Sequence, residues 1–336
     1  MTPSSRSRYE WRLFSGLSIG AAVISAGYGY MMGGTAHSAL VGIANSLAIA
    51  TPILLLEVKG QRTVLRRLRR LPLLAFLGLK TMFYMAMILG GLYLVHAVHP
   101  VGDGRFEDSL GTSVAFSVAM AIVANLVFEI GGLVGFGTLR KLFTGRYIQP
   151  KHEQRAFLLI DMRDSTGLAE RLGPVRFHEL LSDFFRDVSD AALECQAEIY
   201  KYVGDEAILT WPTGTDLADG DCLRCPFLVR ELIEHRRSTY MRRYGVVPAF
   251  RAAVHYGEIV AGEIGDVRRE IAYVGDTLNT AARLLDAAKE VGHDVLVSDE
   301  LLAQAALPDG VTAEKLPTIS LRGRIQPLGI AALKTA

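Results

Sequence analysis

Four long stretches near the start of the chain are apolar and almost free of charged side chains. Residues 13–32 and 39–56 contain no acidic or basic side chain, 71–98 contains only Lys80 and His96, and 110–128 is again uncharged. Each is close to the roughly 20 residues that a helix needs to cross a bilayer. A cleaved signal peptide is the alternative for the first stretch, but three more follow it. The pattern predicts an all-α transmembrane four-helix domain over residues 1–139, with spans at about 13–32, 38–57, 72–96 and 112–136.

Basic residues are distributed unevenly around these stretches. They occur in the N-terminal tail, in the second connection and after the fourth stretch, whereas the first and third connections contain little that is basic apart from Arg105. Because short loops rich in Lys and Arg stay in the cytoplasm, both termini are predicted to be cytoplasmic and the protein to be a multi-pass protein of the inner (plasma) membrane. The arginine-rich segment 62–70 is attributed to topology and to anionic headgroups of the lipid bilayer, with no nucleic acid as partner.

Two charged residues interrupt the apolar stretches. Lys80 and Glu129 lie at similar depths from the predicted cytoplasmic ends of the third and fourth spans. Either they form an ion pair within the membrane, or each extends separately to the inner interface, and the sequence leaves both alternatives open. The nearby Gly131-x-x-x-Gly135 motif permits close approach of neighbouring helices.

The overall composition excludes several classes of protein. The 336 residues include 36 Lys and Arg against 35 Asp and Glu, so the net charge of +1 provides no basic excess for nucleic-acid binding. With 50% hydrophobic residues the chain is neither disordered nor fibrous. Its three cysteines, of which Cys222 and Cys225 form a lone C-x-x-C pair, are too few for a disulfide framework or a complete four-cysteine zinc site.

After residue 139 the apolar segments become short and are separated by polar turns. We predict a linker over 140–152 and a second domain over 153–336. The segment 156–161 is typical of a buried strand, and Ser165 or Thr166 is predicted to cap the helix that follows. The other predicted elements are strands at 197–202, 207–211, 249–256 and 270–274, and helices at about 219–243 and 277–289. This order is that of a ferredoxin-like α/β sandwich.

Two aspartates occupy positions that this fold brings together. Asp161 closes the first strand, and Asp205 lies in the tight turn between the next two strands. Converging carboxylates with nearby main-chain oxygens suit hard cations that bridge phosphate oxygens. The main-chain amides between Met162 and Thr166, at a helix start, form a place for an anionic phosphate. Taken alone, Asp161 is better interpreted as a strand end and Asp205 as a turn residue, so the hypothesis depends on their combination.

Three motifs occur in this half of the chain in a fixed order. They are Leu159-Ile-Asp161-x-x-x-Ser165-Thr166, Lys201-Tyr-Val-Gly204-Asp205-Glu206 and Val274-Gly275-Asp276-Thr-Leu-Asn279-Thr-Ala-Ala-Arg283-Leu. In order and spacing they resemble the three signatures of class III nucleotidyl (adenylate or guanylate) cyclases, over about residues 152–336. The four-span front end with its Gly-Arg-Tyr…Pro linker is similar to a membrane-anchored bacterial branch of that family.

The resemblance implies a role for each matching residue. Asp161 and Asp205 match the two metal-binding aspartates, with the Met162 carbonyl as a further ligand, for two Mg²⁺ or Mn²⁺ ions per active site. Asn279 and Arg283 match the catalytic residues that orient the ribose and stabilise the pentavalent α-phosphate. These two are four residues apart on a helix and hence on one face.

Other matches concern the nucleotide substrate. Lys201 matches the lysine that reads adenine, whereas relatives that select guanine usually carry glutamate there. One of Arg322 and Arg324 matches the lysine that holds the triphosphate. The sequence departs from the family at Ala272, where an aspartate or threonine often contacts the base. Because the alanine side chain cannot hydrogen-bond, adenine selectivity rests more on Lys201 and some use of GTP is left open.

The resemblance therefore implies a membrane-bound adenylate cyclase, a lyase that converts ATP into 3′,5′-cyclic AMP and pyrophosphate. It also implies an active homodimer with two shared active sites. Three alternatives are a guanylate cyclase, a catalytically silent cyclase-like receptor module, and a small transporter with a regulatory domain. Lys201 disfavours the first, the complete set of metal and transition-state residues disfavours the second, and four spans without a conspicuous polar pathway disfavour the third.

Overall fold

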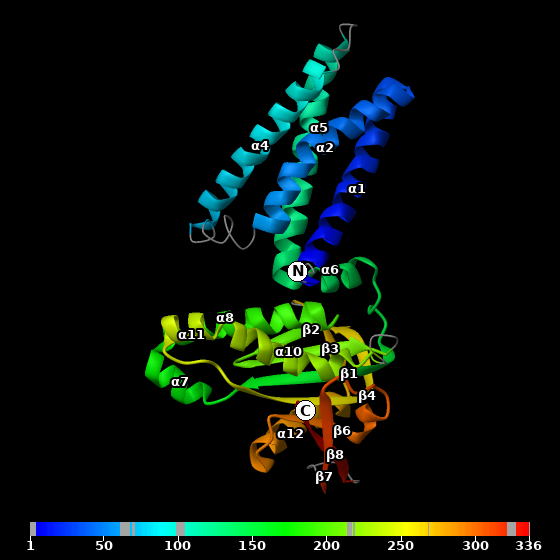
Figure 1. Cartoon of the computed structure of the whole chain (residues 1–336). Helices are drawn as coiled ribbons and strands as arrows, with labels where there is room; N and C mark the ends of the chain where they lie inside the picture. The colour runs from blue at the N-terminus through cyan, green and yellow to red at the C-terminus, as the bar shows by residue number, and fades with distance from the viewer. Residues whose placement is uncertain are drawn as a thin grey trace. The chain divides into compact units, whose positions relative to one another are not determined.

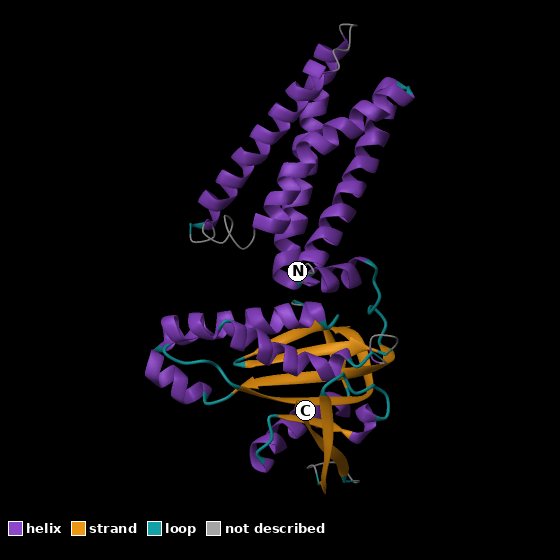
Figure 2. Cartoon of the chain, viewed as in Figure 1, coloured by secondary structure: helices purple, strands orange, loops and turns teal. Residues whose placement is uncertain are grey.

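The computed structural model divides into two compact units, residues 1–139 and 140–336 (Figure 1). It describes residues 5–60, 68, 71–98, 105–213, 217, 219–267, 269–320 and 327–335. Figure 2 shows helices in the first unit and a sheet covered by helices in the second. The prediction of an all-α region followed by an α/β domain is confirmed.

Four helices of the first unit are long and apolar enough to cross a membrane. Their surfaces expose large apolar side chains such as Met31, Met82 and Tyr93, as expected of helices that contact lipid rather than water. The helices are α1 (Ser5–Gly33), α2 (Ala36–Lys59), α4 (Leu73–Val98) and α5 (Arg105–Val134). The spans within them are Leu13–Gly33, Ala36–Lys59, Gly78–Val95 and Val114–Gly132.

Close helix packing occurs between α1 and α2. A Cβ atom at Gly29 would lie 2.3 Å from the carbonyl oxygen of Ser38, and one at Gly42 would lie 2.3 Å from a carbonyl oxygen of α1. Glycine at both positions therefore lets the two backbones approach. The motif singled out from the sequence behaves differently, because Gly135 follows the end of α5 with a φ of 89°, so Gly131 and Gly135 do not share one helix face.

A buried ion cluster joins three of these helices. The Lys80 ammonium lies 2.8 Å from Glu129 Oε1 and 2.9 Å from Glu57 Oε1, and the Tyr84 hydroxyl donates a hydrogen bond to Glu57 Oε1. The side chains of Lys80 and Glu57 are 1% and 0% exposed. Of the two alternatives left open by the sequence, the ion pair is confirmed. Glu57, at the end of the predicted second span, was not singled out.

The sheet of the second unit begins with the strand order β2-β3-β1-β4, which is that of a ferredoxin-like fold. It continues through β6, β8 and β7, while β5 pairs with β4. Most pairs are antiparallel, and β4 and β6 are parallel. The strands are β1 (Lys151–Met162), β2 (Glu198–Val203), β3 (Glu206–Pro212), β4 (Phe250–Ile264), β5 (Glu270–Val274), β6 (Val295–Ser298), β7 (Val311–Ile319) and β8 (Leu328–Thr335).

Helices cover both faces of this sheet (Figure 2). One apolar core, which includes Leu180 and Phe184, lies between the sheet and α8 and α10, and a second, which includes Leu284 and Ala288, lies beneath α12. A strand buried on both faces needs a continuous apolar run, as 156–161 has. The helices are α6 (Phe136–Phe143), α7 (Ser165–Leu172), α8 (Pro174–Glu194), α10 (Asp221–His235), α11 (Arg237–Tyr244), α12 (Asp276–Val291) and α13 (Asp299–Leu302).

Two helices predicted as continuous are broken. The first divides at Gly173, which has a φ of 76° and precedes Pro174 at the start of α8. A positive φ is open to glycine, and proline suits the first turn of a helix, so the break has a local cause. The second, predicted over 219–243, divides at Arg236 between α10 and α11. There the Arg236 guanidinium and the Tyr240 hydroxyl both bind the Asp187 carboxylate of α8.

Removal of Lys80, at the centre of the buried ion cluster, should destabilise the first unit. Lys80→Met leaves the Glu57 and Glu129 carboxylates without their ammonium, and we expect a loss of about 3–5 kcal/mol of unfolding free energy. The triple change Lys80→Met, Glu57→Gln and Glu129→Gln should recover most of it, because no unmatched charge then stays buried. Thermal unfolding of the detergent-solubilised protein measures both effects.

The matched control is Lys59→Met, whose ammonium lies over the Trp11 ring at 3.7 Å. If Lys80→Met is no less stable than this control, the cluster does not hold the helices together.

Candidate active site

The pairing of β1 with β3 brings Asp161 close to Asp205 and Glu206. Asp161, the penultimate residue of β1, lies opposite Glu206, the first residue of β3, and Asp205 directly precedes Glu206 in the turn. The Asp205 carboxylate is close enough to Asp161 for its negative charge to oppose ionisation of Asp161. The convergence predicted from the fold is therefore present in the structure.

Like charge accumulates at this point. Burial raises the pKa of Asp161, and the neighbouring Asp205 carboxylate raises it further, while the Lys289 ammonium opposes the change. Burial together with the charges of Asp161 and Asp205 raises the pKa of Glu206 to about 7. A group of carboxylates held together against their repulsion is the environment that a divalent cation neutralises.

The donor atoms at this site fit a hard divalent cation for which the protein supplies only some of the ligands. In the described ranges no three His, Cys, Asp or Glu side chains are arranged so that they could hold a metal ion by themselves. Two carboxylates and the main-chain oxygen of Met162, which ends β1, leave positions for water and phosphate oxygens. Mg²⁺ and Mn²⁺ are commonly bound in this way beside a nucleotide.

The loop after β1 has the geometry of an anion site but not the predicted cap. Asp164 is the N-cap of α7, with a φ of 54° and no side-chain cap hydrogen bond, whereas Ser165 and Thr166 already belong to the helix. The prediction that Ser165 or Thr166 caps the helix is therefore wrong. Because Asp164 leaves the first amides uncapped, they stay available to an anion. The Asp164 carboxylate lies close to Gly167, where a Cβ atom would be 2.4 Å from Asp164 Oδ1 and the exposed Asp164 side chain would have to move.

Lys201 has an ionic partner that the motif analysis did not identify. Its ammonium lies 2.9 Å from Glu270 Oε1 on β5, and this hydrogen bond raises the Lys201 pKa. The Tyr273 amide also donates to the Tyr200 hydroxyl at 3.4 Å, which joins β5 to β2. Ala272 is buried and lies two residues after Glu270, so strand alternation puts both on one side of β5. This alternation is the signal by which Glu270 could have been found.

Asn279 and Arg283 lie on α12, as predicted. Asn279 is exposed, and Arg283 is half-buried with an Nη1 atom that has no hydrogen-bond partner. The start of the helix is fixed by the Thr277 hydroxyl, which donates to the Glu258 carbonyl oxygen at 2.6 Å. Within the described residues no hydrogen bond or ion pair joins Asn279 or Arg283 to the two aspartates, whereas Lys289 of the same helix lies 3.6 Å from Asp161. Arg322 and Arg324 lie outside the described residues.

The chain is similar to known proteins over most of its length. A family model described as the adenylate and guanylate cyclase catalytic domain matches residues 148–330. "Adenylate cyclase 2" of Rhizobium meliloti is 36% identical over 88% of this chain and 83% of that protein. The chain belongs to the adenylate and guanylate cyclase family. This confirms the resemblance inferred from the three motifs.

Two further similarities extend over about half of the chain. "Adenylate cyclase 1" of Rhizobium meliloti is 30% identical over 52% of this chain and 26% of that protein. The crystal structure of the adenylyl cyclase CyaB from P. aeruginosa aligns with a TM-score of 0.48 and 20% identity, over 56% of this chain and 97% of that one.

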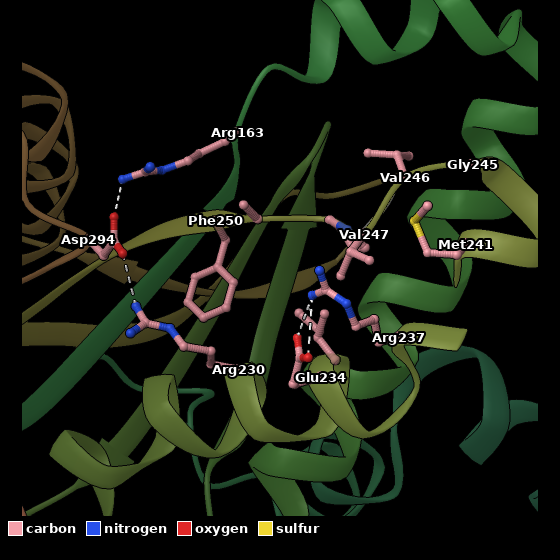
Figure 3. Close-up of a pocket in the computed structure, with 13 residues that line it drawn as sticks. Arg163, Arg230, Glu234, Arg237, Met241, Gly245, Val246, Val247, Phe250 and Asp294 are labelled. Atoms are coloured by element: carbon pink, nitrogen blue, oxygen red, sulfur yellow. Dashed lines mark hydrogen bonds and ion pairs between the residues drawn. The ribbon is translucent and has the colours of Figure 1, made fainter. Parts of the chain in front are cut away.

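A cavity of about 540 Å³ in the cyclase domain lies elsewhere (Figure 3). It is lined by α10, α11 and the residues that precede β4, and its arginines are already neutralised. Asp294 binds both Arg163 and Arg230, and Glu234 binds Arg237. None of the residues that the cyclase motifs single out lines it, so we do not assign the nucleotide to this cavity.

The repulsion at Asp161 should be measurable in the metal-free cyclase. A raised pKa means that ionisation of Asp161 costs stability as the pH rises above the normal range of an aspartic acid. In EDTA at pH 8, Asp161→Asn should therefore raise the unfolding free energy by roughly 1 kcal/mol, and the gain should vanish toward pH 4. Thermal unfolding at several pH values tests this. The control is Asp309→Asn at an exposed turn, and equal shifts in the two variants would contradict the prediction.

Proposed function

We propose that this protein is a membrane-anchored adenylate cyclase that converts ATP into 3′,5′-cyclic AMP and pyrophosphate. The observation that carries the proposal is that β1–β3 pairing puts Asp161 beside Asp205, in a cyclase chain that also has a lysine at position 201. The similarity to a Rhizobium meliloti protein named adenylate cyclase, over most of both chains, supports it.

The residues at the end of β1 bind the metal and the phosphates in this proposal. Asp161, Asp205 and the Met162 carbonyl would hold two Mg²⁺ or Mn²⁺ ions. When bound, these ions supply Lewis acidity that makes the ribose 3′-hydroxyl easier to ionise and neutralises the triphosphate. The amides at the start of α7 bind a phosphate together with the side chains of Ser165 and Thr166.

The residues of α12 act on the reacting centre. Arg283, whose Nη1 has no partner, places positive charge where the pentavalent α-phosphate gains negative charge. Asn279, one turn earlier, orients the ribose so that the 3′-oxygen is in line with the leaving pyrophosphate. Arg322 or Arg324 holds the triphosphate tail.

The base is read by Lys201. Its ammonium donates to a ring nitrogen of adenine, which is an acceptor, whereas guanine presents an N–H donor at the corresponding position. Glu270, 2.9 Å away, fixes the direction of the ammonium. Ala272 gives no side-chain hydrogen bond, so this lysine carries the discrimination.

The active site is shared in a homodimer. Asp161 and Asp205 of one subunit meet Lys201, Asn279 and Arg283 of the partner subunit, and two-fold symmetry gives two equivalent sites. The lack of a hydrogen bond or ion pair between Arg283 and the aspartates of its own chain, within the described residues, supports this arrangement.

The helices of residues 1–139 anchor the enzyme in the inner membrane, with the linker 140–152 and the catalytic domain 153–336 in the cytoplasm.

Incubation of the purified protein with ATP or GTP and Mg²⁺ or Mn²⁺, followed by product identification, tests the proposal. Cyclic AMP from ATP is expected. Cyclic GMP from GTP, with no product from ATP, indicates a guanylate cyclase, and no product from either nucleotide indicates a silent module.

Lys201→Glu should lower kcat/KM for ATP at least roughly tenfold, because a carboxylate would face an acceptor nitrogen. The new carboxylate would also face Glu270, so the charge-swapped variant Lys201→Glu with Glu270→Lys is the matched control for folding. Both variants should have low ATP activity, but only the single variant should lose thermal stability. Unchanged ATP kinetics in either variant would show that Lys201 does not read the base.

The shared site predicts complementation between inactive variants. Asp161→Ala homodimers should be inactive for want of metal, and Arg283→Ala homodimers nearly so for want of charge stabilisation. When the two are co-expressed, the heterodimer has one site with both defects and one intact site, so activity should return to up to about half of the wild-type value per heterodimer. If isolated mixed dimers have no activity, the site is not shared in this way.

A further inference from the structure

Lys289 belongs to none of the three cyclase motifs, but it lies beside the Asp161 carboxylate. It is close to the C-terminal end of α12, and its ammonium is 3.6 Å from Asp161 Oδ2 and 3.3 Å from Asp286 Oδ1. The Lys289 side chain is 46% exposed, whereas that of Asp161 is 17% exposed. A flexible cation at the surface is thus in contact with a mostly buried carboxylate.

The charges around Asp161 explain why a cation is needed there. Asp205 and Glu206 are its acidic neighbours, and Asp286 adds to the negative charge at Glu206. The Lys289 ammonium opposes the negative charge at Asp161. The i,i+3 pair with Asp286 on an exposed helix surface is worth little by itself. The contact with Asp161 is not of this kind, because the Asp161 carboxylate is mostly buried and is already repelled by the Asp205 carboxylate.

We propose that Lys289 is the internal counter-cation of the metal carboxylates. In the metal-free protein its ammonium neutralises Asp161, and a divalent cation that binds Asp161 and Asp205 must displace it. Lys289 thereby weakens binding of the bare metal. When the metal arrives with a nucleotide, the negative triphosphate offers the displaced ammonium a new partner, so the lysine favours binding of metal and nucleotide together. This inference rests on the proposed function, in which the two aspartates bind metal.

Lys289 is a positioning residue in this account, and metal binding without catalysis reports on it directly. Mn²⁺ is titrated into the full-length, detergent-solubilised protein at fixed pH and ionic strength without nucleotide, and free Mn²⁺ is measured by electron paramagnetic resonance. Lys289→Gln should bind Mn²⁺ roughly tenfold more tightly than the wild type, because one repelling positive charge is lost. Lys289→Arg should stay close to the wild type.

Lys334→Gln is the matched control. Lys334 is a similarly exposed lysine, at 52%, which pairs with Glu314 across β8 and β7. Its replacement changes the net charge equally and should leave the Mn²⁺ affinity within about twofold, since charges beyond a Debye length of roughly 10 Å are screened. Thermal unfolding establishes that each variant is folded, and Lys289→Met replaces the glutamine variant if that one is not.

The outcomes separate this inference from the proposed function. Wild-type Mn²⁺ affinity in Lys289→Gln, together with lost binding in Asp161→Asn, would overturn the counter-cation and leave the metal site intact. Wild-type binding in Asp161→Asn would instead overturn the metal assignment itself. With a non-hydrolysable ATP analogue present, the difference between wild type and Lys289→Gln should shrink, and a difference that persists unchanged contradicts the link to the nucleotide.

Discussion

Repulsion between the Asp161 carboxylate near the end of β1 and the Asp205 carboxylate in the β2–β3 turn is the constraint on which the cyclase half depends. β1 is paired along its length with β3 on one side and β4 on the other, so Asp161 cannot move away from Asp205 without breaking ladder hydrogen bonds. Apolar cores on both faces, one beneath α8 and α10 and the other beneath α12, hold the strand in place. The fold thus maintains an unfavourable charge arrangement that a bound cation relieves at neutral pH.

Each half of the chain has a lysine that faces two carboxylates, but the two lysine side chains differ in their freedom to move. In the helices of the first unit, Lys80 is shared between Glu57 and Glu129 and is 1% exposed. Such a lysine has no solvated state close at hand, so it acts as a fixed joint between helices. Lys289 also faces two carboxylates but is 46% exposed, so its ammonium reaches water by rotation of its side chain. Exposure, rather than the pairing itself, distinguishes a structural lysine from one that a ligand could displace.

Local patterns predicted most of the architecture and part of the site. The apolar stretches predicted the four helices, and the run 156–161 with its terminal Asp161 predicted the central strand and one wall of the site. The helix predicted after the first strand runs through Gly173, and the break there was missed, although glycine followed by proline separates helices. Contacts between residues distant in the sequence could not be predicted from these local patterns. Glu57 and Lys80 meet only when α2 and α4 pack, and the break at Arg236 depends on Asp187 of another helix.

The residues that the proposed function assigns to the base show that a motif position does not by itself establish a function. At position 272 the family often has a side chain that contacts the base, and this chain has alanine, which by itself suggests weak discrimination. The structure instead has a carboxylate two residues earlier, which binds Lys201 at 2.9 Å. An ammonium has three donors and no acceptor, so one hydrogen bond to Glu270 fixes its direction and leaves donors for the base. In the proposed site guanine is then rejected because two donors would face each other, and this rejection needs no hydrogen bond from residue 272.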